Sequence, residues 1–204
     1  MTDEMQTLRD DIAYLKGLAE AGRDGANSGG SIILVAAGGL FGAASVVQWA
    51  ALTGSFGATA LTSNGAWLIA MLLFFAVLIG AKLRRGPATG SAQSAGLAWK
   101  GVGIGCFFIF AAIAAATWRT QNATLINFSP SIIFVLYGAA WMVAATVSRK
   151  VWLHLTAWGS FAASILTAWF INQPVDYLIY AAGLLLLAFL PGLVLLRGAS
   201  QGRD

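Results

Sequence analysis

The sequence predicts an all-α, polytopic membrane protein in which six transmembrane helices form three hairpins, preceded by a cytoplasmic amphipathic helix. Two observations lead to this fold class. Six apolar stretches divide the chain after residue 30, each close to the roughly 20 residues that a helix needs to cross a bilayer. In addition, 58% of the residues are hydrophobic and 10% are charged, which is too little polar surface for a water-soluble domain.

The predicted chain has three parts. Residues 1–30 form the amphipathic helix, over about residues 4–21, and a flexible linker rich in glycine; residues 31–196 form the membrane domain; residues 197–204 are a cytoplasmic tail. The predicted spans are Ser31–Leu52, Ala60–Lys82, Ala95–Trp118, Ser129–Val147, Val151–Ile171 and Val175–Leu196. Because three residues separate the fourth span from the fifth, these two are expected to form a tight antiparallel pair.

The positive charges predict the orientation of the spans. Among the 12 Lys and Arg residues, Arg119 alone lies on the side opposite the termini. Cytoplasmic loops are enriched in Lys and Arg, so both termini are predicted to be cytoplasmic. The basic pI near 9.6 then reflects topology and anionic lipid, and no nucleic-acid partner is expected. The high Ala and Gly content favours a bacterial protein of the inner membrane.

The N-terminal segment has the pattern of a coiled coil. Its apolar residues alternate in steps of three and four, as positions a and d of a heptad do: Met5, Leu8, Ile12, Leu15 and Ala19. In a parallel pair this register sets Glu4 against Arg9 of the other chain, and Asp11 against Lys16. We therefore expect self-association or docking on the chain's own basic loops, with a separate cytoplasmic or membrane protein partner as the alternative.

Small residues recur one turn apart in three of the spans, in a spacing that lets helices approach closely in lipid. The pairs are Gly38 and Gly42, Gly101 and Gly105, and Gly159 and Ala163. Gly38 and Gly42 are assigned to oligomerisation, together with Met5, Leu8, Ile12 and Leu15.

The first, third and fifth spans share a second pattern. In each, a Phe followed by two small residues precedes a Trp by eight positions: Phe41 and Trp49, Phe110 and Trp118, Phe161 and Trp169. The pattern is consistent with a threefold internal repeat of one hairpin. The alternative is that Phe is plentiful and Trp simply prefers the membrane interface.

No catalytic, metal or cofactor site is predicted. The chain carries no phosphate-binding, nucleophile-elbow or metalloprotease motif, and it has one Cys and one His, too few for a typical metal site within one chain. Asp176, which follows Pro174, is expected to face the positive N-terminal dipole of the sixth span. Pro191 is expected to kink that span by freeing the carbonyl group of Leu187.

Two classes of function remain. The first is a non-enzymatic, oligomeric membrane protein whose N-terminal helix mediates self-association or controls a partner. The alternative is a small channel or carrier for a neutral or weakly polar solute, similar in gross plan to the six-span urea channels but without their polar motifs. Its path through the bundle would be lined by Phe41, Gln48, Phe110, Tyr137, Phe161 and Tyr180. No cofactor is expected in either case, and the lipid bilayer is the partner common to both.

Overall fold

The described residues are organised as helices, without a strand, as the sequence predicts. The computed structural model describes residues 2–84 and 90–201, and, of the side chains before Gly30, those of Gln6 and Ile12. The elements are α1 (Thr2–Thr53), η1 (Ser55–Gly57), α2 (Ala60–Arg84), α3 (Gly90–Thr120), η2 (Ala123–Phe128), α4 (Ser129–Ser148), α5 (Val151–Trp169), α6 (Pro174–Leu184), η3 (Leu185–Phe189) and α7 (Leu190–Gln201). The element η3 is a π-helical turn.

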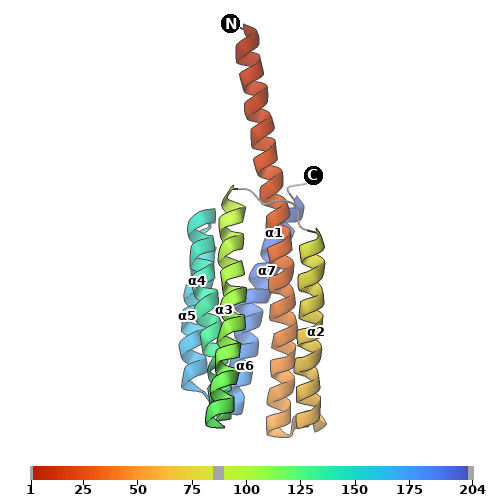
Figure 1. Cartoon of the computed structure of the whole chain (residues 1–204), viewed down its shortest axis with the longest axis vertical. Helices are drawn as coiled ribbons and strands as arrows, with labels where there is room; N and C mark the ends of the chain where they lie inside the picture. The colour runs from red at the N-terminus through yellow and green to blue at the C-terminus, as the bar shows by residue number, and fades with distance from the viewer. Residues whose placement is uncertain (1, 85–89, 202–204) are drawn as a thin grey trace.

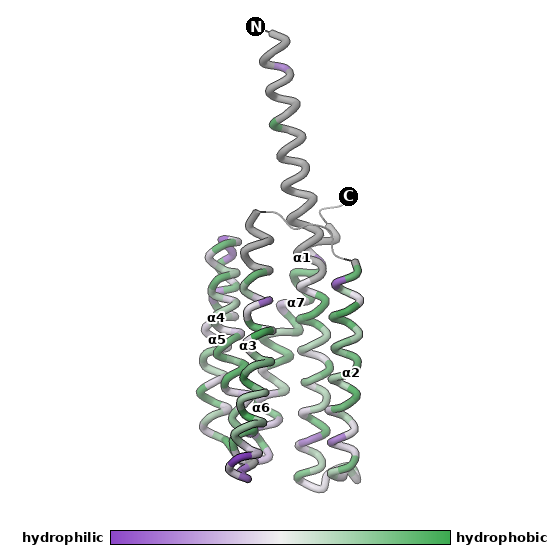
Figure 2. The backbone as a smooth tube through the Cα atoms, in the orientation of Figure 1, coloured by the Kyte–Doolittle hydropathy of each residue, from purple (hydrophilic) through white to green (hydrophobic). Residues whose placement is uncertain are grey.

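Six helices among these residues are long and apolar enough to cross a membrane, which confirms the predicted number. They cover Gly30–Thr53, Ala60–Leu83, Leu97–Thr120, Thr124–Ser148, Val151–Trp169 and Pro174–Gly198. Each overlaps one predicted span, with ends that differ by a few residues. Figure 2 shows apolar residues along the bundle and polar residues gathered toward its two ends, as expected of a multi-pass membrane protein.

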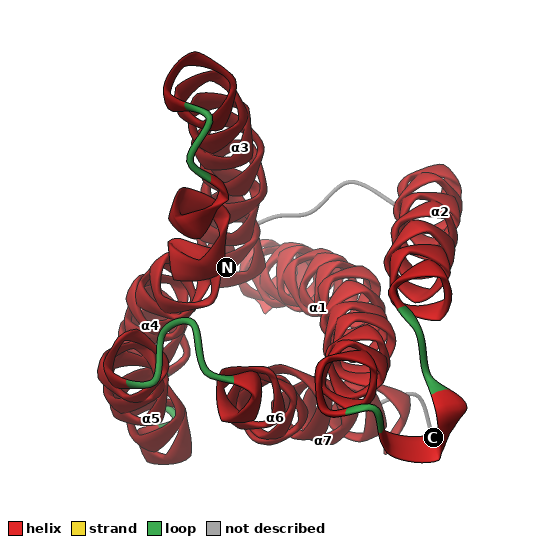
Figure 3. Ribbon diagram, turned by 90° about the horizontal axis from the view of Figure 1, so that it is seen from below, coloured by secondary structure: helices red, strands yellow, loops and turns green. Residues whose placement is uncertain are grey.

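Both termini lie at the same end of the bundle (Figure 1), called here the terminal end; the opposite end is the far end. Seen along the bundle (Figure 3), α1 lies between α2 on one side and α6 with α7 on the other. The helices α3, α4 and α5 form the remaining part, with α4 packed between α3 and α5. The helix α2 packs chiefly on α1, so α1 connects it to the bundle.

The helix α1 is continuous over 52 residues and therefore about 78 Å long at 1.5 Å per residue. Its N-terminal part extends away from the bundle (Figure 1). The flexible linker predicted at residues 22–30 is helical in this structure, which corrects the sequence prediction. Each glycine weakens a helix by about 1 kcal/mol relative to alanine. Helical φ and ψ are nevertheless open to glycine, and residues on both sides extend the helix without a new nucleus.

Short turns with left-handed backbone reverse the chain between spans. At the far end Gly54 and Gly57 have φ of 68° and 66°, a region that glycine enters without the steric cost of a Cβ atom. At the terminal end Arg149 has φ of 54° and ends α4. Two residues then suffice to connect α4 to α5, so these two helices lie side by side along their length (Figure 3).

The sixth span is interrupted close to the predicted place. The helix α6 ends at Leu184, the π-helical turn η3 covers Leu185–Phe189, and α7 continues from Leu190. Pro191 cannot donate a backbone hydrogen bond and its ring crowds the preceding turn, which favours a local rearrangement of the helix. The expected kink therefore takes the form of a π-helical turn just before the proline.

Close helix contacts form at two of the three predicted pairs of small residues. A Cβ atom added to Gly38 would lie 2.7 Å from the backbone nitrogen of Phe189, and one added to Gly159 would lie 2.9 Å from Leu187. By contrast, Gly101 has no atom within 4 Å of such a Cβ. The prediction that α3 packs closely through Gly101 is therefore wrong for the single chain, because this residue lies on the exposed face of α3.

Candidate functional site

An aromatic core lies between α3, α4 and α6. Phe134, Tyr137 and Trp141 are spaced by three and four residues along α4, which places them on one helix face, and all three are buried. The ring of Phe134 lies 5.3 Å from that of Tyr180 on α6. Trp99 on α3 meets Tyr137 edge-on at 5.5 Å and Trp141 at 4.8 Å. These aromatic contacts join three spans.

This core also completes the hydrogen bonding of the interrupted sixth span. Pro191 has no N–H group for the carbonyl oxygen of Leu187, four residues earlier. The indole Nε1 of Trp141 donates a hydrogen bond to that oxygen at 2.9 Å. Leaving such a buried acceptor without a partner would cost about 1–3 kcal/mol. Trp141 thus provides from α4 the donor that Pro191 lacks.

A second polar group lies between α4 and α5, toward the far end. The hydroxyl oxygens of Ser131 and Thr167 are 2.9 Å apart and buried. Thr167 Oγ1 also donates to the carbonyl oxygen of Ala163 at 3.0 Å, so Ser131 is the donor to Thr167. Closer to the far end, Asn127 Nδ2 donates to Asn172 Oδ1 at 2.8 Å, which ties η2 to the turn between α5 and α6.

The helix α2 is attached to α1 by polar and aromatic contacts. Gln48 Oε1 accepts hydrogen bonds from Ser63 Oγ and, at 3.2 Å, from Trp67 Nε1. The ring of Phe41 lies 6.2 Å from that of Trp67 and 5.2 Å from that of Phe74. Because α2 packs chiefly on α1, these contacts carry much of its attachment.

The six side chains expected to line a path do not lie together in the structure. Tyr137 and Tyr180 are in the aromatic core, and Phe41 and Gln48 pack against α2. Phe110 lies on α3 and Phe161 on α5. Phe161 packs against Gly138 of α4, and Phe110 is 41% exposed. The chain therefore does not gather these six side chains around one path. The three Phe residues of the proposed repeat also have different surroundings.

No protein family, curated protein or solved structure matched the chain. The indole of Trp141, the amide oxygen of Gln48 and the hydroxyl group of Ser131 all bond to other helices of the same chain. Polar contacts of this kind stabilise helix pairs in a membrane.

The residues assigned to oligomerisation have different positions. Ile12 is 59% exposed on the projecting part of α1, whereas the side chains of Met5, Leu8 and Leu15 lie outside the described residues. Gly38 and Gly42 are buried against the chain's own sixth span, near Phe189 and Ala181 respectively. Packing within the chain therefore covers both glycines, and their assignment to an interface between copies stays a prediction.

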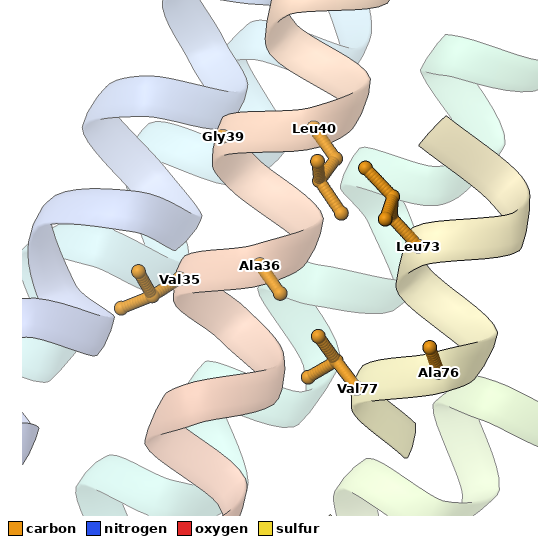
Figure 4. A pocket seen from close by; sticks show the side chains of 7 residues that line it. All are labelled: Val35, Ala36, Gly39, Leu40, Leu73, Ala76 and Val77. Atoms are coloured by element: carbon orange, nitrogen blue, oxygen red, sulfur yellow. The ribbon is translucent and has the colours of Figure 1, made fainter. Parts of the chain in front are cut away.

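A shallow groove of about 610 Å³ lies between α1 and α2 (Figure 4). It is lined by residues without polar side chains: Val35, Ala36, Gly39, Leu40, Leu73, Ala76 and Val77. All of these residues belong to membrane spans. The groove therefore offers no polar side chain that could bind a hydrophilic solute.

Sequence reasoning missed Trp141 and the hydroxyl pair of Ser131 and Thr167. A signal for Trp141 exists in the sequence, since it lies seven residues inside its span, away from the interface where Trp is usual. A tryptophan buried in a membrane usually finds a partner for its N–H group. Its acceptor could not be named, because the register of α4 against the sixth span is a tertiary property.

Proposed function

We propose that this chain is a non-enzymatic, oligomeric integral membrane protein of the bacterial inner membrane, whose N-terminal helix mediates self-association or controls a partner. The observation that carries the proposal is the continuity of α1. One helix runs from Thr2 through the first span to Thr53. Pairing of its projecting part would therefore act directly on the first membrane span.

The projecting part of α1 supports self-association. It extends away from the bundle (Figure 1), which disfavours the alternative of docking on the chain's own loops. Ile12, a heptad a position, is 59% exposed, so a second helix could bury it. Burying apolar a and d residues drives coiled-coil pairing. Tethering to the membrane raises the effective concentration of this short segment.

The effect of pairing the projecting helix would extend to the packed part of the bundle. Beyond Gly30 the same helix contacts α6, η3 and α7. At Gly38 the backbones approach closely enough that a Cβ atom would lie 2.9 Å from the Leu184 oxygen. A change in the position of the N-terminal helix would therefore alter the contact of α1 with the interrupted sixth span.

The charges at the two ends of the bundle support a cytoplasmic location for both termini. Of the cations whose side chains the structure describes, Lys82, Lys100, Arg149, Lys150 and Arg197 belong to the terminal half of the bundle and Arg119 to the far end. The terminal end is therefore assigned to the cytoplasm by the positive-inside rule. The same topology fits three hairpins, formed by the first and second, third and fourth, and fifth and sixth spans.

Cysteine cross-linking tests the proposed pairing. In a Cys106→Ala background, Ile12→Cys is expected to form a chain-to-chain disulfide in oxidised membranes, because a positions of parallel helices face each other. Asp10→Cys is the matched control, since residue 10 falls on the opposite side of the heptad and is expected to cross-link weakly. Equal disulfide yields at the two positions, or no disulfide at Ile12→Cys, would contradict the proposal.

The alternative of a small channel or carrier is favoured by one observation, the interruption of the sixth span at Leu185–Phe189. Broken helices recur at the binding sites of transporters, and Tyr137 and Tyr180 lie in the adjoining core. Stopped-flow flux of urea and glycerol into proteoliposomes separates the two functions. Flux above that of protein-free liposomes, lowered by Tyr137→Phe, would favour the carrier. Well-folded protein without flux would favour the first function.

A further inference from the structure

Asp176 is an anomaly in the membrane part of the chain. Its side chain is 4% exposed, and its Oδ1 atom has no hydrogen-bond partner. Among the described residues, no Lys, Arg or His forms an ion pair with it. Burying an uncompensated carboxylate costs several kcal/mol, and ionisable groups of this kind within membrane spans mark functional sites.

The carboxyl group is directed into the bundle and is not the cap of α6. The cap residue of α6 is Gln173, without a side-chain cap bond, and the Asp176 N–H group bonds to the Gln173 oxygen at 3.0 Å. Tyr180, one turn further along α6, lies on the same helix face and is buried against Phe134. Asp176 therefore belongs to the inward face of α6.

The aromatic contacts of α4 and α6 indicate that hydroxyl groups of the neighbouring helices lie at a level close to that of Asp176. The ring of Phe134 on α4 lies against Tyr180 and Gly183 of α6, and both helices begin at the far end. Ser131 precedes Phe134 by three residues and Asp176 precedes Tyr180 by four, about 4.5 and 6 Å along the two helices. Ser131 donates its proton to Thr167 Oγ1, so its oxygen keeps lone pairs for a further partner.

We propose that Asp176, Ser131 Oγ and Thr167 Oγ1 form a site for one small monovalent cation, such as Na⁺, at the far end of the bundle. The three side chains offer oxygen atoms, which hard cations prefer. They carry one negative charge in total, which suits a monovalent ion better than Ca²⁺, whose sites commonly combine several carboxylates. The N-terminal dipole of α6 favours the charged form of Asp176, and no Lys, Arg or His of the described residues pairs with this carboxylate, so its charge is available to a cation.

The cation would reach this site from the far side of the membrane. Asp176 lies in the first turn of α6, within about 5 Å of the helix end. The exposed hydrogen bond between Asn127 and Asn172 holds η2 against the adjoining turn. The site is thus shallow, and binding there would join α4, α5 and α6 through one ion.

Equilibrium binding of radioactive ²²Na⁺ to the full chain in nanodiscs tests the proposal, with choline chloride keeping the ionic strength constant. Wild-type protein is expected to bind saturably, approaching one ion per chain, and excess unlabelled NaCl is expected to displace the label. Asp176→Asn is expected to abolish binding, and Ser131→Ala to weaken it severalfold. Ser160→Ala is the matched control, because Ser160 Oγ donates to the Thr156 oxygen of its own helix at 2.8 Å.

Thermal unfolding provides a second measurement. A ligand that binds the folded state raises Tm, so NaCl in place of choline chloride is expected to stabilise the wild type and Ser160→Ala, but not Asp176→Asn. The proposal is overturned if well-folded wild-type protein neither binds nor is stabilised by Na⁺ or K⁺, a result that does not depend on whether a variant folds. It is also overturned if folded Asp176→Asn still binds the ion.

Discussion

The indole nitrogen of Trp141 donates a hydrogen bond to the carbonyl oxygen of Leu187, 46 residues later in the chain, at 2.9 Å. The bond joins α4 to the π-helical turn of the sixth span. The carbonyl oxygen of Leu187 needs this donor because Pro191, four residues later, has no backbone N–H group. The aromatic core and the break in the sixth span are therefore one structural unit.

Trp141→Phe is expected to lower the free energy of unfolding by about 1–3 kcal/mol, the cost of an unpaired buried acceptor. The new ring still packs against Trp99. In a Pro191→Ala background the substitution should cost less, because the introduced alanine brings an N–H group that can bond to the Leu187 oxygen. Unfolding of the wild type, the two single variants and the double variant in detergent gives the coupling energy between Trp141 and Pro191. Equal costs in both backgrounds would contradict the link between Trp141 and Pro191.

Gly38→Ala is expected to destabilise the bundle by about 1–3 kcal/mol, as overpacking does. The added Cβ atom would meet backbone atoms of Phe189 and Leu184 at 2.7 and 2.9 Å, and backbone cannot move aside as a flexible side chain can. Gly101→Ala is the control, since nothing lies within 4 Å of its added Cβ. The fraction of protein that stays monodisperse after heating, measured by size-exclusion chromatography, should fall for Gly38→Ala alone.

Gln48→Leu is expected to loosen α2, since it removes the acceptor shared by Ser63 and Trp67. Hydrogen exchange in nanodiscs should then rise more in residues 60–83 than in α4 and α5, because α2 packs chiefly on α1. Gln121→Leu should leave α2 unchanged, as Gln121 bonds to the Trp118 oxygen at an exposed position of the far end. A uniform rise across all spans would show that Gln48 has no particular role in holding α2.

The spans could be predicted because membrane insertion depends on local composition. Apolar length alone located all six helices. Proline chemistry likewise identified the free carbonyl of Leu187, since the missing bond depends only on sequence separation. Both predictions concern a helix and its solvent, and neither needs the position of another helix.

Predictions that needed the packing of one helix on another were confirmed at some positions and wrong at others. Gly38 and Gly101 look alike in sequence, yet the first is covered by the sixth span and the second is open. The partner of Trp141 depends on the register of α4. The glycines of residues 22–30 predicted a break, but glycine propensity is a weak preference that a continuing helix overrides.

Charge exchange in the N-terminal helix tests the central claim of self-association most directly. One chain carries Glu4→Lys with Asp11→Lys, the other Arg9→Glu with Lys16→Glu, and both carry Ile12→Cys and Cys106→Ala. The measurement is the yield of disulfide between two differently tagged chains, expressed alone or together. Parallel pairing predicts little disulfide for either chain alone and a strong yield for the mixed pair, in which opposite charges face each other. Equal yields within each chain and between them would contradict the account.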